Sequence, residues 1–127
     1  MPLTNAGRNM IGALLVGQAT TAFTSTAAHI AVGNSSTAFA SADTDMQGSE
    51  TARKAMDTGF PTRTLNSLVF RATFSAGEAN LSGGWEEWGV TNSAVGGTLL
   101  NRAVSALGEK TAAQTWQVTC SVLVQNP

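Results

Sequence analysis

The chain is poor in charge, has one cysteine and one histidine, and contains no tyrosine. Because Cys120 is the single cysteine, no internal disulfide can form, which is typical of synthesis in a reducing cytoplasm. Charged residues are 12% of the chain and the net charge is -1, so charge alone attracts neither nucleic acid nor an anionic membrane. The longest strongly apolar run, residues 10–16, is far below the roughly 20 residues that span a bilayer. We therefore expect no direct nucleic-acid partner and no membrane partner.

A chain of 127 residues has the usual size of one domain and can bury one hydrophobic core. We therefore predict a single domain over residues 1–127. Its surface is expected to be neutral and rich in small side chains, because Ala, Ser, Thr and Gly are abundant and charge is scarce. Such a surface repels its neighbours weakly, which suits a protein that packs against other subunits.

The N-terminal segment, residues 1–27, is predicted to form a short helix or arm. Thr4 is a suitable N-cap, Met10 and Leu14 have helical spacing, and Gly17 is a typical residue at a helix end. Residues 18–27 are rich in Thr and Ala and show no clear period. We expect a linker or an extended arm there.

The remaining residues, 28–127, have the alternating pattern of a β protein. Strands are predicted at residues 28–33, 65–74, 85–92, 98–107 and 116–124, separated by turns that contain glycine. Several short strands of this kind favour a mainly β fold, an antiparallel β-sandwich of jelly-roll-like type. Residues 35–64 are predicted to be a long loop, in which residues 50–55 could form a short strand or a helical turn.

The inward faces of these strands define a predicted core. Alternation places the core at Leu68, Phe70, Phe74, Val118, Val122 and at least one of Trp88 and Trp116. Exposed tryptophans could instead stack on bases or sugars, but aromatic residues at strand spacing are mostly core.

No residue pattern predicts an enzyme. His29 has no Cys, Asp or Glu beside it, so a structural histidine is favoured over a catalytic base. Cys120 lies on the apolar face of the last predicted strand, as a core thiol would. Glu86 and Glu87 are neighbours in a strand and point to opposite faces, so they cannot act together as acid and base. We therefore assign no catalytic residue.

One of the two glutamates is nevertheless expected to have a buried partner. Alternation puts Glu87 on the face of Trp85 and puts Glu86 on the opposite face. A partly buried carboxylate needs an arginine or backbone amides beside it, and Arg71 and Arg102 are the candidate partners.

Two motifs resemble ligand sites but lack a required residue. Residues 43–48 begin like a calcium loop, yet the twelfth position is Lys54 where a bidentate glutamate is needed. Residues 108–111 resemble the end of a phosphate-binding loop, yet Glu109 separates the glycine from the lysine. A hairpin turn is the better interpretation there. We assign no metal-binding and no cofactor-binding residue.

Four segments of the chain are similar to structural proteins of tailed bacteriophages. They are residues 3–7 (LTNAG), 30–33 (IAVG), 87–92 (EWGVTN) and 96–102 (GGTLLNR). The pattern resembles both small head-decoration proteins, also called cement proteins, and the N-terminal attachment modules of tail-collar fibres. This resemblance implies a β-rich module that docks onto a larger virion lattice and has no turnover chemistry.

Three function classes follow. The first is a capsid decoration protein that is made in the host cytoplasm, binds the outer surface of the virion and fastens subunits of the major capsid protein together. The second is a small tail, neck or baseplate component. The chain ends at Pro127, directly after the last predicted strand and without a fibre shaft, which favours decoration. The third is a carbohydrate-binding β-sandwich that uses Trp85 and Trp88.

The resemblance also implies self-association as a homotrimer, because a capsid offers threefold positions. Residues 18–27 and 35–64 are expected to bury little within the domain. Segments of this kind can become ordered on a partner and wrap a large surface. We therefore expect both segments to contact neighbouring subunits of the shell.

Overall fold

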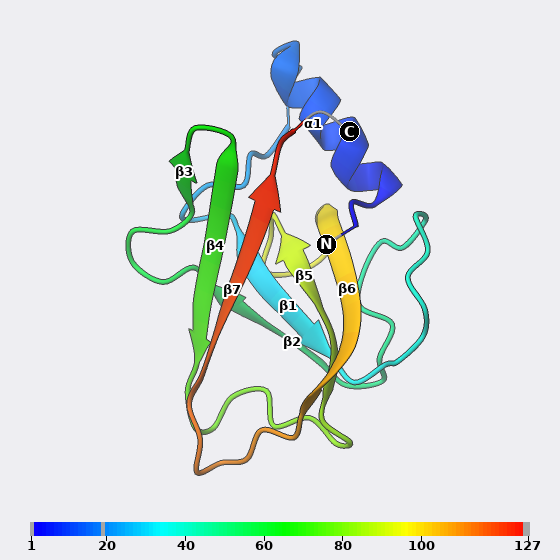
Figure 1. Ribbon diagram of the computed structural model, residues 1–127, viewed down its shortest axis with the longest axis vertical. Helices are drawn as coiled ribbons and strands as arrows, with labels where there is room; N and C mark the ends of the chain where they lie inside the picture. Colours follow the sequence, from blue (N-terminus) through cyan, green and yellow to red (C-terminus); the bar gives the residue numbers. More distant parts are fainter. Residues whose placement is uncertain (1, 19, 126–127) are drawn as a thin grey trace.

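The computed structural model describes residues 2–18 and 20–125 and contains two antiparallel sheets and a single N-terminal helix (Figure 1). The four-stranded sheet has the order β2 (Thr51–Ala55), β1 (His29–Gly33), β5 (Trp85–Thr91) and β6 (Leu99–Gly108). The three-stranded sheet has the order β3 (Thr62–Thr64), β4 (Ser67–Phe74) and β7 (Trp116–Leu123). The predicted mainly β fold with a short N-terminal helix is confirmed. The described residues form seven strands, where a jelly roll has eight.

The two sheets pack face to face around one hydrophobic core. Ile30, Val32 and Val90 contribute from the four-stranded sheet, and Phe70 and Phe74 contribute from the three-stranded sheet. Each of these side chains is at most 3% exposed. Full burial of a side chain of this size contributes about 1.5 to 3 kcal/mol, so these contacts hold the sheets together.

The predicted core residues separate into two groups. Phe70 and Phe74 are buried as predicted. Leu68, Val118, Val122, Trp88 and Trp116 pack against the core but remain partly exposed. For Val118 and Val122 the reason is position, because β7 is an outer strand of its sheet and a neighbouring strand covers it on one side only.

A β-bulge in β5 changes the predicted alternation. The register between β5 and β6 shifts between Trp85 and Glu87, so the two side chains do not share a face. Trp85 turns into the core, where its ring lies edge-to-face with Phe74 and with Trp116 at 5.0 Å between centroids. Glu87 points to the outer face of the four-stranded sheet. The prediction that Trp85 and Glu87 share a face is therefore wrong.

The helix α1 (Asn5–Leu15) begins where the sequence indicates, with Thr4 as its N-cap. The Thr4 hydroxyl is buried, accepts a hydrogen bond from the Gly7 N–H and donates to the carbonyl oxygen of Leu99. A Cβ atom at Gly7 would lie 2.2 Å from the carbonyl oxygen of Leu100, so glycine lets α1 approach β6 closely. The helix ends before Gly17, whose φ of 71° is typical of a helix C-terminus.

The segment predicted as one long loop contains β2 and β3 and is packed on the chain itself. Met46 is buried against Ala31 and Leu99 on the outer face of the four-stranded sheet. The arm is held as well, because the Asn92 side chain donates to the carbonyl oxygen of Thr21. The described parts of both segments are therefore held by contacts within the chain. For residues 37–48 the physical reason is a buried ion pair, described below. Contact of these segments with neighbouring subunits stays a prediction.

Candidate interaction surface

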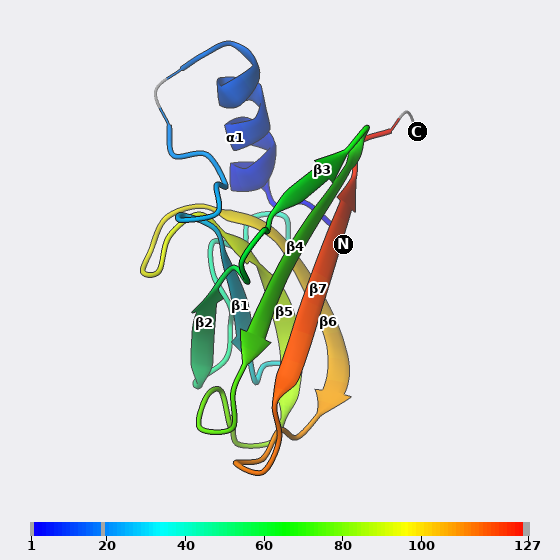
Figure 2. The same ribbon diagram turned by 90° about the vertical axis from the view of Figure 1, so that its left-hand side faces the viewer.

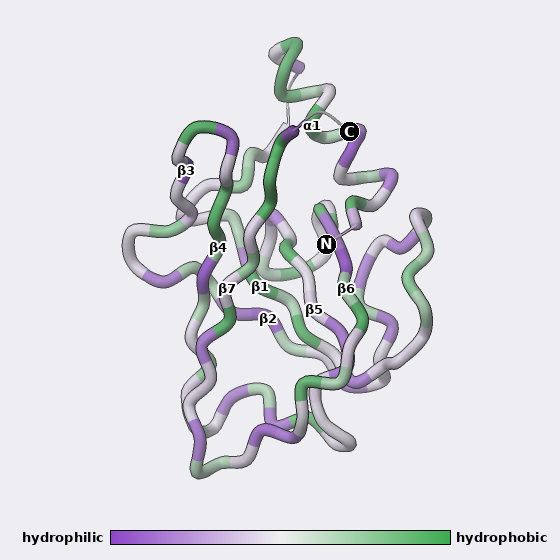
Figure 3. Tube along the Cα trace, viewed as in Figure 1, coloured by the Kyte–Doolittle hydropathy of each residue, from purple (hydrophilic) through white to green (hydrophobic). Residues whose placement is uncertain are grey.

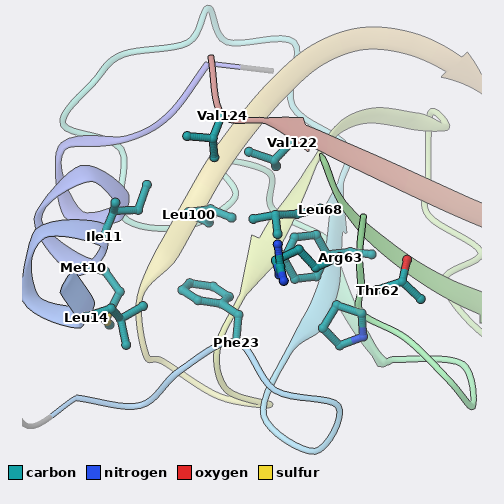
Figure 4. A pocket seen from close by; sticks show the side chains of 12 residues that line it. Met10, Ile11, Leu14, Phe23, Thr62, Arg63, Leu68, Leu100, Val122 and Val124 are labelled. Atoms are coloured by element: carbon teal, nitrogen blue, oxygen red, sulfur yellow. The ribbon is translucent and has the colours of Figure 1, made fainter. Parts of the chain in front are cut away.

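One end of the molecule carries an apolar groove between α1 and the three-stranded sheet (Figure 4). Its cavity measures about 280 Å³. Its lining is mostly apolar and comprises Met10, Ile11, Leu14, Phe23, Pro61, Leu68, Phe70, Leu100, Val122 and Val124, together with Thr62 and Arg63. A groove of this composition can accept an apolar side chain of a partner.

The groove exists because the two sheets do not end at the same level. Figure 2 shows β4 and β7 extending beyond the end of the four-stranded sheet, with α1 standing opposite them. Leu68 and Val122 are direct partners across β4 and β7. They face α1 at a place where a complete sandwich would offer a second sheet. The groove is therefore an unfilled end of the core.

Of the exposed large hydrophobic side chains in the described part of the chain, Ile11, Leu14 and Val124 line this groove. Leu15 and Val16 follow at the C-terminal end of α1, and Leu65 lies in the β3–β4 turn. Leu123, which alternates with Val122 and Val124 and so points to the other face of β7, Val95 and Leu107 lie elsewhere. Figure 3 shows the hydrophobic segments of α1, the β3–β4 turn and the end of β7 at the same end of the molecule. We call the groove and the side chains of Ile11, Leu14, Leu15, Val16, Leu65 and Val124 the apolar end. Apolar patches of this kind on soluble proteins mark interaction sites.

Leu65 is the most informative residue of the apolar end. It is the first of the two residues that connect β3 to β4, it is 83% exposed, and its φ is 55°. Two-residue hairpin turns favour Gly, Asn or Asp at a position with positive φ, and a leucine there is strained by roughly 1 to 2 kcal/mol. Neither the turn nor the core explains a leucine at this position. A conflict between local preference and residue type is expected at functional positions.

A buried ion pair fixes the outer face of the four-stranded sheet. The Glu87 carboxylate accepts hydrogen bonds from the Arg102 Nε at 2.8 Å and from the backbone N–H groups of Gln47 at 2.9 Å and Gly48 at 2.8 Å. Arg102 also contacts Asp43 at 3.0 Å. Both Glu87 and Arg102 have fully buried side chains. The prediction that one glutamate pairs with an arginine or with backbone amides is confirmed, with Glu87 and Arg102 as the pair.

The other candidate partner, Arg71, has a different role. It pairs with Asp57 at 3.0 Å and lies over the Phe60 ring at 4.1 Å from its centroid. The Glu86 side chain has no hydrogen bond or ion pair in the described part of the chain. The two neighbouring glutamates therefore differ completely in environment.

The residues weighed for catalysis or metal binding lie apart from one another. His29 Nδ1 donates to the carbonyl oxygen of Ala27 at 2.9 Å. Cys120 is buried, and burial raises the pKa of its thiol to about 12. Asp43 and Asp45 contact Arg102 and Arg53 respectively. Within residues 2–18 and 20–125, no three His, Cys, Asp or Glu side chains are grouped so that they could hold a metal ion.

Lys110 has a role that the sequence did not reveal. Its side chain is buried, and its Nζ donates to the carbonyl oxygens of Ser75 and Ala76 and to Asn80 Oδ1. The ammonium group thereby joins the β4–β5 connection to the β6–β7 connection. Of the two tryptophans considered for sugar binding, Trp85 is buried and Trp88 is half-buried, so Trp85 offers no face for stacking.

Comparison of the chain with known protein families, proteins and structures identifies no relative. No protein-family model matches the chain, and neither a curated protein nor a solved structure shows significant similarity to it. No helix among the described residues is long and apolar enough to cross a membrane.

Proposed function

We propose that this chain is a structural protein of a tailed-bacteriophage particle, a capsid decoration protein that docks onto the major capsid protein through its apolar end. The observation that carries docking is the strained and exposed Leu65, whose carbonyl oxygen accepts a hydrogen bond from Arg63, a residue of the groove lining. The resemblance of residues 3–7, 30–33, 87–92 and 96–102 to phage structural proteins supports the choice of partner.

The distribution of charge supports close packing of this chain against other copies and against a shell. Ion pairs within the chain engage Arg53, Lys54, Arg71 and Arg102, four of the seven basic residues. The surface therefore keeps few free charges, and copies held side by side would repel one another weakly. A decoration protein at high local density needs this property.

Docking through a preformed surface replaces the wrapping mechanism expected from the sequence. Residues 37–48 are held on the four-stranded sheet by Glu87 and Arg102 and are not free to wrap a partner. The apolar end is already assembled in the isolated chain. Binding then requires little ordering of loops, which lowers the entropic cost of association.

The test is binding to shells of the phage that encodes this chain, prepared without it. Leu65→Asn removes an exposed apolar side chain and places a residue suited to positive φ in the turn. Val95→Asn is the matched control, because Val95 is 85% exposed, lies beside residues 51–53 of β2 and does not line the groove. Burial of a leucine contributes about 1.5 to 3 kcal/mol, so Leu65→Asn should weaken co-sedimentation with shells roughly 10- to 100-fold. Val95→Asn should bind like the wild type.

Two results would contradict the proposal. Equal binding of both variants would remove the apolar end as the docking surface. Location of the chain only on the tail, in a density map of the intact particle, would replace decoration by the tail alternative. If decoration is correct, shells without the chain should also release their genome at a lower temperature.

A further inference from the structure

Each sheet has two edge strands, and three of the four are protected, fully or over part of their length, against pairing with another chain. β2 carries Arg53 and Lys54, and β3 has three residues. The first half of β6 is covered by the N-terminal segment, because Arg102 N–H donates to Pro2 and Thr4 N–H donates to Leu100. Charge, short length and a covering segment are the usual means by which sheets avoid edge-to-edge association.

The fourth edge strand, β7, has none of these protections. It is eight residues long, and residues 111–125 contain no charged residue, no proline and no glycine. Beside its first half lies a hollow lined by Trp85, Trp88 and Leu107 from the other sheet and by residues 116–119 of β7. An uncharged edge of this length would be an aggregation site if nothing covered it.

The unused backbone groups of β7 can be assigned from its pairing with β4. The Val124 N–H donates to the carbonyl oxygen of Asn66 at 2.9 Å, so the backbone N–H and C=O groups of Val124 point toward β4. The alternation of an antiparallel ladder then turns the N–H and C=O groups of Gln117, Thr119, Ser121 and Leu123 toward the open edge. In the part of the chain that the structure describes, no hydrogen bond reaches these groups.

We propose that this edge binds β7 of a second copy of the chain, antiparallel and related by a two-fold axis. Such a contact joins two three-stranded sheets into one continuous sheet. A two-fold contact places a strand opposite itself, so a strand with one kind of charge would repel its copy. β7 carries no charge, and its outward Thr119 and Ser121 can form hydrogen bonds across the pair.

The geometry also selects a register. With the axis beside Cys120, Thr119 pairs with Ser121 of the second copy and Gln117 pairs with Leu123 of the second copy. All four residues with unused groups are then paired. A shift by two residues in one direction sets Leu123 of each copy opposite residue 115, and a shift in the other direction sets Gln117 opposite residue 125, both of which lie outside β7.

Two double variants that differ at one position test both the contact and its register. Thr119→Glu is common to both, and Arg71, its partner on β4, can accommodate a carboxylate. Thr119→Glu with Ser121→Glu sets like charges opposite each other twice in the dimer, whereas Thr119→Glu with Ser121→Lys sets opposite charges there. We expect the wild type and the Glu/Lys variant to dimerise in analytical ultracentrifugation of the purified chain. The Glu/Glu variant should dimerise at least about tenfold more weakly.

Tryptophan fluorescence and circular dichroism of the three proteins at low concentration establish that all are folded. The proposal is overturned if the wild type stays monomeric at every concentration, since β7 would then be left to a strand of another protein. It is also overturned if the Glu/Glu variant associates as strongly as the Glu/Lys variant, or if the wild type forms a trimer that neither variant changes. These measurements use no shells, so they are independent of docking through the apolar end.

Discussion

Replacing Glu87 by glutamine should destabilise the protein more than any other change of one carboxylate to an amide. Glu87 is fully buried, and its two oxygen atoms accept hydrogen bonds from Arg102 and from the N–H groups of Gln47 and Gly48. A glutamine keeps one acceptor oxygen and places an NH2 group against one of these donors. It also leaves the Arg102 guanidinium with Asp43 as its remaining charged partner.

The size of the effect follows from these contacts. Breaking a buried ion pair by removing one partner costs about 3 to 5 kcal/mol, because the other charge stays buried. Asp43 and one remaining acceptor at position 87 offset part of this cost, so we expect about 3 kcal/mol for Glu87→Gln. Replacing both members, in Glu87→Gln with Arg102→Met, should cost less than the sum of the two single variants.

Urea unfolding monitored by tryptophan fluorescence gives the free energies for this comparison. Glu86→Gln is the matched control, because the neighbouring carboxylate has no partner, and its effect should stay within about 0.5 kcal/mol. Hydrogen exchange adds a local measurement, since the amides of Gln47 and Gly48 should exchange faster in Glu87→Gln and not in Glu86→Gln. Equal stability of the two variants would refute the buried pair and, with it, the account of why the long segment is ordered.

Three further outcomes are expected. Phe70→Ala should lower the free energy of unfolding by about 3 to 5 kcal/mol in urea unfolding, because a buried ring is lost from between the sheets. Glu78→Gln should change how the free energy of unfolding falls in acid. The hydrogen bonds from Lys54 and Ser75 lower the pKa of Glu78 from 4.5 to about 2, so the contribution of the Glu78 carboxylate to stability is complete above pH 4.5. This contribution disappears as the pH falls toward 2, and thermal melts of wild type and variant should converge there. Cys120 should resist alkylation until the protein is unfolded, because burial raises its pKa to about 12, and mass spectrometry with and without urea checks this.

The strands were predictable because alternation reports burial directly. In β4 the pattern of Leu68, Phe70 and Phe74 gave both the element and its inward face. The helix was predictable from Thr4 and Gly17 because capping is local chemistry that involves residues close in sequence. Features that depend on neighbours within a few positions are therefore the ones that a single sequence reveals.

The pairing of distant segments was only partly predictable. That Glu87 needed a partner followed from its place in a strand, but its amide partners, Gln47 and Gly48, lie 40 and 39 residues away in the sequence. Nothing in their local sequence distinguishes these amides from others. The long segment therefore resembled a free loop, and its packing on the sheet became visible only with the fold.

The apolar end could not be predicted because its parts are unremarkable separately. The apolar residues of α1, such as Ile11 and Leu14, predict an ordinary amphipathic helix that packs on a core. The sequence pattern predicts Leu65 as the first residue of a strand, although the chain turns there with positive φ. Its exposure depends on the position of the β3–β4 turn beyond the four-stranded sheet, which is a property of the tertiary structure.

The apolar end and the β7 edge can act together, because they contact different partners. A two-fold dimer through β7 carries two apolar ends, so after one end binds a shell the second is held near neighbouring subunits at a high effective concentration. Each docking contact can then be weak while the pair is held firmly, provided that the spacing of the two ends matches the lattice. The Glu/Glu variant at positions 119 and 121 keeps its apolar end intact, so it should bind shells through single contacts and dissociate faster than the Glu/Lys variant. Surface plasmon resonance on immobilised shells compares the two dissociation rates, and equal rates would mean that docking does not use the dimer.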